Sequence, residues 1–187
     1  MAFAARFVTF FLAFSNLVSL SLAAPAPAVV CSLDQIAADV QQISTQTLAL
    51  DNHVLAFPDS GGLASDAMLV HTDLQGVISA IDTTAADMEP CPAPFNDDLF
   101  QNLLSSVQTI ISQESQAMND LVAKKPAFDA VGGVSPIFKQ DLDNLRASSV
   151  VLENVWLARA PADLVGQAQT LADEINNVLA SAQAAYA

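Results

Sequence analysis

Few residues in this chain could carry chemistry: two histidines, two cysteines and twenty carboxylates. His53 and His71 have no Cys or His three or four positions further on that would complete a metal site, and polar residues flank both. We therefore expect surface-facing imidazoles rather than catalytic or metal-binding ones.

The acidic residues stand singly or in short pairs, such as those at 97–98 and 173–174. This distribution is typical of a solvated face, and it matches neither a calcium loop nor a catalytic carboxylate pair. The tetrapeptide DSGG at 59–62 resembles a serine-protease fragment, but Pro58 precedes it and no β-barrel pattern surrounds it. The sequence therefore predicts a protein that is not an enzyme, with no cofactor and no metal.

Cys31 and Cys91 are expected to form one disulfide, because an even number of cysteines behind a signal peptide fits an oxidising compartment. A pair of free buried thiols is the alternative. The bridge would close a long loop and contribute on the order of 4 kcal/mol to stability in the chain-entropy model.

The first residues have the layout of a secretory signal peptide. A basic residue at position 6 precedes an apolar run over 7–22, and small residues follow at 23–28. We predict a signal peptide at 1–24, with cleavage between about 23 and 28, and one domain at 30–187. An uncleaved anchor is the alternative, but the run is shorter than the roughly 20 residues of a spanning helix.

The net charge limits the partners. The formal charge is −14, and no Lys or Arg occurs between residues 7 and 123. Such a surface repels nucleic acid and anionic lipid headgroups. No hydrophobic tail for a lipid anchor follows the domain, so we expect a secreted, extracellular protein, free or loosely associated with the cell wall.

Apolar residues recur every three or four positions along five segments, which predicts five amphipathic helices. Ser32 and Gln35 form a capping-box pattern at the first, and Asn96 or Asp97 can cap the third. Residues 126–136 are predicted to be irregular, with one short turn of helix. The predicted helices are 32–57, 63–88, 96–125, 135–160 and 164–182.

No alternating pattern of a strand competes with these helices, so the predicted fold is all-α, an up-and-down bundle of about five amphipathic helices. Cys31 precedes the first helix and Cys91 follows the second. If those helices are antiparallel neighbours, both cysteines lie at the same end of the bundle.

Large rings lie near the predicted helix ends, whereas aliphatic, small and hydroxylated side chains occupy the middle turns. Five such helices would enclose an elongated apolar cavity that suits an acyl chain, with Thr47 or Ser149 hydrogen-bonding its carboxyl group. The candidate lining residues are Val40, Ile43, Thr47, Leu50, Val70, Leu74, Val77, Ile81, Leu103, Val107, Ile110, Leu142, Leu145, Ser149, Leu171 and Ile175.

Two other outcomes fit the same apolar stripes. Small residues also let helices pack closely and leave no void, as most protein interiors do. A bundle can also open at an apolar interface and lay its stripes upon it.

The pattern DVQQISTQTLALDNHVLAF at 39–57, followed by LVHTDLQGVISAI at 69–81, resembles the fungal hydrophobic surface-binding protein A family. That family includes the lipid-binding domains of fungal cell-wall galactomannoproteins. The resemblance covers roughly residues 30 to 185. It implies a secreted all-α protein that adsorbs to hydrophobic surfaces, in some members recruiting hydrolases, with relatives that hold fatty acids.

The sequence departs from the galactomannoprotein relatives by lacking a Ser/Thr-rich stalk and an anchor tail, which favours free secretion. The expected function is non-enzymatic binding of hydrophobic surfaces or fatty-acid-like lipids. The alternative is an acidic interaction protein that recruits a hydrolase or engages a host protein.

Overall fold

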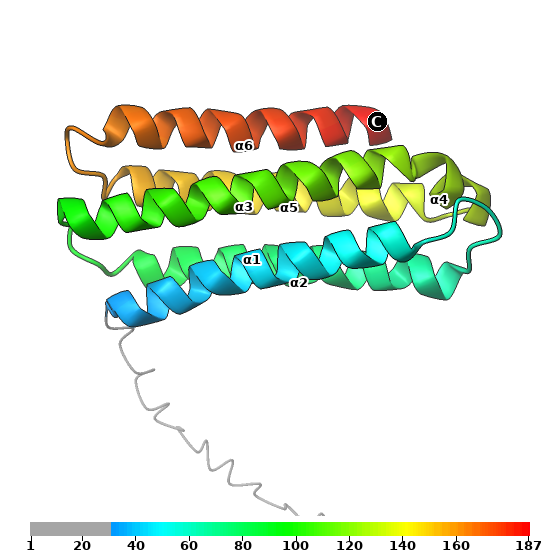
Figure 1. Ribbon diagram of the computed structural model, residues 1–187, viewed down its shortest axis with the longest axis horizontal. Helices are drawn as coiled ribbons and strands as arrows, with labels where there is room; N and C mark the ends of the chain where they lie inside the picture. Colours follow the sequence, from blue (N-terminus) through cyan, green and yellow to red (C-terminus); the bar gives the residue numbers. More distant parts are fainter. Residues whose placement is uncertain (1–30) are drawn as a thin grey trace, which may run out of the picture.

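The computed structural model describes residues 31–187, which form six α-helices and contain no strand. The predicted signal peptide lies outside the described residues. Five helices are long, and their bounds confirm the predicted all-α bundle (Figure 1). They are α1 (Leu33–Ala56), α2 (Ala64–Met88), α3 (Asp97–Ala123), α5 (Ser135–Leu157) and α6 (Val165–Tyr186), and the short one is α4 (Lys125–Val131).

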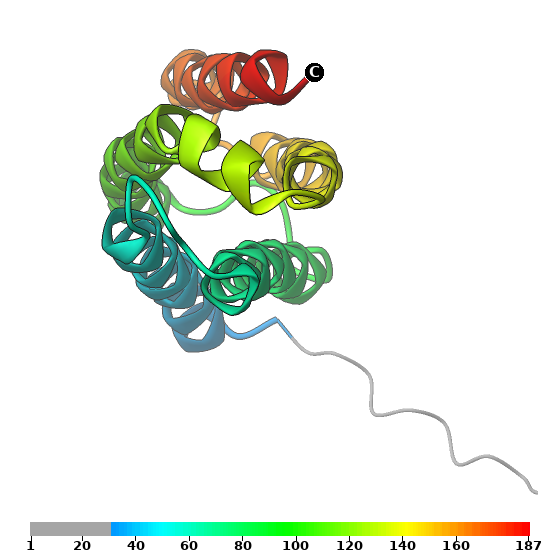
Figure 2. The same cartoon turned by 90° about the vertical axis from the view of Figure 1, so that its right-hand side faces the viewer.

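The long helices close a ring. Successive long helices run in opposite directions (Figure 1). Helix α1 packs against α2 and α3, α2 packs against α5, and α6 packs against both α3 and α5. The order around the ring is therefore α1, α2, α5, α6 and α3, as the end-on view in Figure 2 shows. Each helix turns its apolar stripe toward one shared interior.

The helix starts are set by short polar side chains. Ser32 accepts a hydrogen bond from the Gln35 backbone N–H at 3.3 Å, and Asn96 accepts one from Leu99 N–H at 2.8 Å. The second half of the predicted capping box is wrong, because the Gln35 side chain donates to Asp39 Oδ1 at 2.7 Å instead of turning back to Ser32.

The segment at 126–136, predicted to be mostly irregular, contains helix α4. Pro126 occupies the first turn, where a missing N–H costs nothing, and Phe128 is fully buried beneath it. Gly132 and Gly133 have φ values of +78° and +74°, which glycine adopts without a Cβ clash. Part of the connector is thus a short helix that contributes a fully buried ring to the core.

Aromatic rings gather at the two ends of the bundle. At the end where α4 lies, Phe57, Phe128, Phe138 and Tyr186 form a chain of contacts, with ring centroids 4.3, 4.8 and 6.1 Å apart along it. We call these four residues the α4-end cluster. At the opposite end, Phe100 lies between Phe95 and Trp156, at 6.5 and 6.1 Å.

Cys31 and Cys91 form a disulfide, with Cα atoms 4.7 Å apart. It joins the start of α1 to the segment after α2. The antiparallel pairing of α1 and α2 brings the two cysteines to one end, as the sequence predicts, and we call this end the disulfide end.

Candidate functional site

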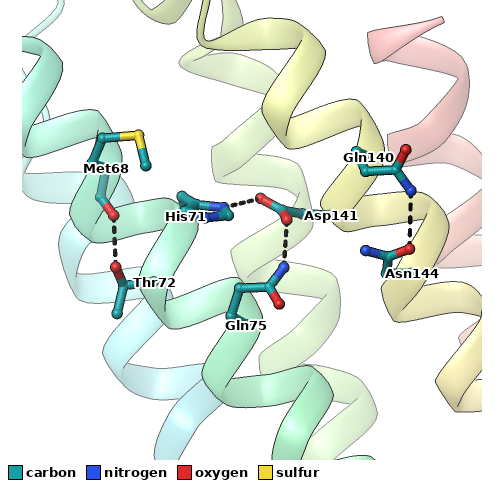
Figure 3. A network of polar contacts seen from close by, with 7 residues as sticks. All are labelled: Met68, His71, Thr72, Gln75, Gln140, Asp141 and Asn144. Carbon is teal, nitrogen blue, oxygen red and sulfur yellow. Dashed lines mark hydrogen bonds and ion pairs between the residues drawn. The ribbon is translucent and has the colours of Figure 1, made fainter. Parts of the chain in front are cut away.

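His71 lies on α2 and contacts α5. Its Nδ1 is 2.7 Å from Asp141 Oδ2, and Gln75 Nε2 donates to Asp141 Oδ1 at 2.5 Å (Figure 3). The Asp141 residue is only 2% exposed. The expected surface-facing imidazole therefore holds only in part for His71: its side chain is 28% exposed, but its ring also partners a buried carboxylate, which needs such partners. His53 is exposed and pairs with Asp73 at 2.5 Å.

This network joins α2 to α5. The hydroxyl of Thr72, one residue along α2, donates to the Met68 carbonyl at 2.9 Å (Figure 3). Within residues 31–187, no group of three or more His, Cys, Asp or Glu side chains is arranged to hold a metal ion.

An apolar cavity lined by side chains from all five long helices is the main candidate site. Its volume is about 60 Å³, room for a few water molecules and well below the ~300 Å³ at which ordinary ligand sites begin. It lies in the half of the bundle nearer the disulfide end. The lining comprises Val40, Ile43, Ile81, Thr84, Met88, Leu103, Val107, Ile110, Glu114, Ser149, Leu152, Glu153, Trp156 and Ile175.

The cavity opens on one side of the ring. Three lining side chains are half-buried: Val107 on α3, Leu152 on α5 and Ile175 on α6. Helix α6 packs against both α3 and α5. Solvent therefore reaches the cavity where these three helices meet, and a shift of α6 would widen that opening.

The structure divides the sixteen candidate residues into two groups. The first lines the cavity: Val40, Ile43, Ile81, Leu103, Val107, Ile110, Ser149 and Ile175. The second is buried in packed core away from it: Thr47, Leu50, Val70, Leu74, Val77, Leu142, Leu145 and Leu171. The predicted elongated cavity is thus shorter than expected, because side chains fill the interior toward the α4-end cluster.

Sequence reasoning missed the polar part of the lining. Glu114 and Glu153 are 5% and 8% exposed. Glu114 stands four residues after Ile110 and three before Ala117, so it occupies a position of the apolar stripe of α3. The carboxylate at a position of the apolar stripe was the one feature of the sequence that could have indicated a polar group in the lining. The other missed residues, Thr84, Met88, Leu152 and Trp156, carry no such mark.

The two cavity glutamates have altered acidity. Burial, reinforced by the charge of Glu153, raises the pKa of Glu114 from its ordinary 4.5 to about 7. Burial also raises the pKa of Glu153, against a hydrogen bond that Asn176 Nδ2 donates to its Oε2 at 2.8 Å. Charge in this cavity is therefore costly.

The hydroxyl groups near the cavity already have acceptors. Thr84 donates to the Ala80 carbonyl at 2.8 Å and Ser149 to the Leu145 carbonyl at 2.9 Å. Thr47, which lies away from the cavity, donates to the Ile43 carbonyl at 2.9 Å. Neither predicted hydroxyl is thus free to donate to a ligand carboxyl group.

None of the helices in the described part of the chain combines the length and the apolar character that a bilayer span requires.

Solved structures of two proteins share this fold. Ligand-binding domain 1 of the Penicillium marneffei MP1 protein, complexed with arachidonic acids, matches with a TM-score of 0.76 and 19% identity over 83% of this chain and 99% of that one. AFMP4P in complex with palmitic acid matches with a TM-score of 0.77 and 20% identity over 83% and 100%. At such identities the likeness shows the fold alone.

The sequence itself gives the family. No curated protein matches it. Residues 33–157, which span α1 to α5, match the family model described as hydrophobic surface binding protein A. This match covers more than half of the chain and agrees with the resemblance of its first two helices. The chain belongs to the hydrophobic surface binding protein A family.

Proposed function

We propose that this protein binds the alkyl chain of a single-chain amphiphile, such as a fatty acid, between its five long helices, without catalysing a reaction. The observation that carries the proposal is the apolar cavity to which every long helix contributes. Two proteins with the same fold have been solved in complex with arachidonic and palmitic acids, and the family is one that binds hydrophobic surfaces.

The cavity must expand to hold such a chain. A volume of about 60 Å³ is only a fraction of an ordinary ligand site. The half-buried residues Val107, Leu152 and Ile175 mark the side on which expansion is easiest, since only α6 covers it. Ligand binding then stabilises the wider state, as any ligand with differential affinity does.

The direct test uses delipidated protein and a fluorescent fatty acid. Val107→Trp replaces a small aliphatic side chain with an indole ring at the opening of the cavity. We expect the affinity for the fatty acid to fall by about tenfold or more. Val151→Trp is the matched control, because Val151 is exposed on α5 and absent from the lining. If the wild-type protein ignores the fatty acid, the proposal fails. Mass spectrometry of lipid that co-purifies with the native protein would identify the ligand.

A second candidate function is adsorption to hydrophobic surfaces, which the family description favours. Large apolar side chains are exposed at Leu48 and Leu55, two turns apart on α1, and at Leu63 before α2. Replacing these three residues with Gln should reduce binding to polystyrene beads and leave fatty-acid binding unchanged. Val107→Trp should do the reverse, so the pair of variants separates the two functions.

We also propose that the protein is secreted. The apolar segment at 7–22 and the disulfide both favour an oxidising extracellular destination. Comparison of the protein mass in culture medium with the mass of the full chain tests this, because cleavage near residue 24 shortens it. Neither the family nor the two solved structures support a hydrolase as the partner.

A further inference from the structure

Three residues that line the cavity have buried polar atoms without a hydrogen-bond partner in the protein. They are Glu114 Oε1 on α3, and Glu153 Oε1 and Trp156 Nε1 on α5. Buried polar side-chain atoms in native proteins are nearly always hydrogen-bonded. Packing alone does not require three such atoms around one apolar cavity, because apolar side chains of similar size would fill the same positions.

The glutamates face the cavity as acceptors. Glu153 uses Oε2 for the hydrogen bond from Asn176, which leaves Oε1 for another donor. Because Thr84 and Ser149 donate to carbonyls of their own helices, the lining supplies no hydroxyl hydrogen to these carboxyl oxygens. The remaining side-chain donor of the lining, the indole Nε1–H of Trp156, is itself without a partner and therefore reaches neither carboxyl oxygen. The missing donor must then come from outside the lining.

The surrounding charges do not neutralise the pair. Arg146 on α5 favours the charged form of Glu153, whereas Asp173 on α6 opposes it, and the charge of Glu153 opposes the charged form of Glu114. The residues that α1 and α2 contribute to the lining, including Val40, are all uncharged. A further negative charge in this cavity would face two carboxyl groups in a medium of low polarity, which is strongly unfavourable.

Building on the proposed function, we propose that Glu114 and Glu153 form a head-group site that accepts the O–H hydrogen of a neutral single-chain amphiphile. The ligands of this class are a long-chain alcohol, a monoacylglycerol, or a fatty acid in its protonated form. A fatty-acid anion has no hydrogen to donate and is repelled. The raised pKa of Glu114, about 7, agrees with this assignment, because the site favours neutral groups.

The protein contains its own reporter for the test. Trp156 lines the cavity and is the single tryptophan of the chain. Titrations of 1-dodecanol and dodecanoic acid, followed by tryptophan emission, can therefore be made at pH 5 and at pH 8. We expect the alcohol to bind at both pH values, and the acid to bind about tenfold more weakly or worse at pH 8.

Replacement of the carboxyl groups tests the assignment itself. In Glu114→Gln/Glu153→Gln, each amide supplies N–H donors and removes a negative charge, so the affinity ratio of the acid between the two pH values should fall by about tenfold. Glu174→Gln is the matched control, because Glu174 is exposed on α6 and outside the lining. The ionisation of the ligand is the same for every variant at a given pH and cancels from the comparison.

The outcomes distinguish this inference from the proposed function. If the wild-type protein binds dodecanoic acid equally at both pH values, or if the double variant keeps the wild-type ratio, the head-group site is overturned while binding of the alkyl chain stands. If neither ligand changes the emission of Trp156 or releases heat in calorimetry, both proposals are overturned. If the double variant does not fold, the single variants Glu114→Gln and Glu153→Gln supply the same comparison with the wild type.

Discussion

At the scale of single residues, the main departure from a simple helical bundle is a carboxyl group in the apolar interior. Glu114 is almost fully buried, and burial raises its pKa to about 7. The folded protein therefore binds a proton at this site between about pH 4.5 and pH 7, whereas the unfolded chain does not. Stability from this group is complete below pH 4.5 and is lost as the pH rises through 7.

Glu114→Gln should abolish this pH dependence. A shift from 4.5 to about 7 corresponds to a penalty of roughly 3 kcal/mol in the wild-type protein above pH 7. We expect the variant to be more stable than the wild type at pH 8, by up to this amount, and similar at pH 4.5. Urea denaturation at the two pH values measures the difference, and Glu174→Gln serves as the control. A wild-type stability that rises between pH 5 and pH 8 while that of the variant stays flat would contradict the assignment.

The residue scale is also where the sequence is least informative. The stripe of α3 predicts Leu103, Val107 and Ile110 as inward-facing, and the structure places all three around the cavity. The same periodicity includes Glu114, but charge alone argues for the surface. Only the packing of five helices shows that this carboxyl group is enclosed. Sequence periodicity gives the direction of a side chain, and it does not show what surrounds it.

At the scale of helix pairs, the contact between α2 and α5 depends on a polar network. Asp141 on α5 is buried and accepts hydrogen bonds from His71 and Gln75 on α2 (Figure 3). Hydrogen bonds to a buried charged group contribute about 1.5–3 kcal/mol each. The contact between α2 and α5 therefore has a specific register that apolar contacts alone would not impose.

Asp141→Ala should destabilise the fold by about 2 kcal/mol or more, because it removes both acceptor atoms and leaves Gln75 without its partner. His71→Ala should cost less, since the side chain of His71 is 28% exposed and water can replace it at Asp141. Chemical denaturation of both variants tests this order. Asp82→Ala, at an exposed position of α2, should have little effect. An equal effect of Asp82→Ala and Asp141→Ala would contradict the role of the network.

The disulfide constrains the pair formed by α1 and α2. It closes a loop of sequence separation 60, which contributes on the order of 4 kcal/mol in the chain-entropy model. Cys31→Ser/Cys91→Ser should lower the free energy of unfolding by about that amount. The wild-type protein in reducing buffer is the matched control and should shift equally. A double variant as stable as the oxidised wild type would show that helix packing alone fixes this end.

Helix positions were the most predictable feature of the element scale. Proline and capping residues predicted the ends of α1, α2 and α3 to within a few residues, because these signals act locally. The position of the cavity was not predictable in this way. Phe57, Phe128 and Phe138 come from three distant segments and together fill one end, so the remaining space lies toward the other.

At the scale of the whole molecule, two kinds of binding are compatible with one ring of helices. A ligand in the cavity uses the inward stripes, whereas adsorption to a surface uses exposed apolar residues such as Leu55 and Leu63 or requires the ring to open. The net charge of the protein should affect adsorption and not binding in the cavity. The lining of the cavity faces the interior of the ring and is mostly apolar, whereas adsorbed molecules meet each other through outer surfaces with a formal net charge of −14 per chain.

Added NaCl should therefore act on adsorption and leave the cavity unaffected. Raising the salt from about 0.01 M to 1 M shortens the Debye length from about 30 Å to 3 Å, so neighbouring adsorbed molecules stop repelling each other. We expect the density of protein on polystyrene beads to rise severalfold, with the affinity for 1-dodecanol changing by less than about twofold. A variant with amides at the exposed residues Asp97, Asp98 and Glu174 should show a smaller salt effect, because it begins with less repulsion. If the density of adsorbed wild-type protein stays constant across the salt range, repulsion between molecules does not limit adsorption. The negative net charge would then serve solubility alone.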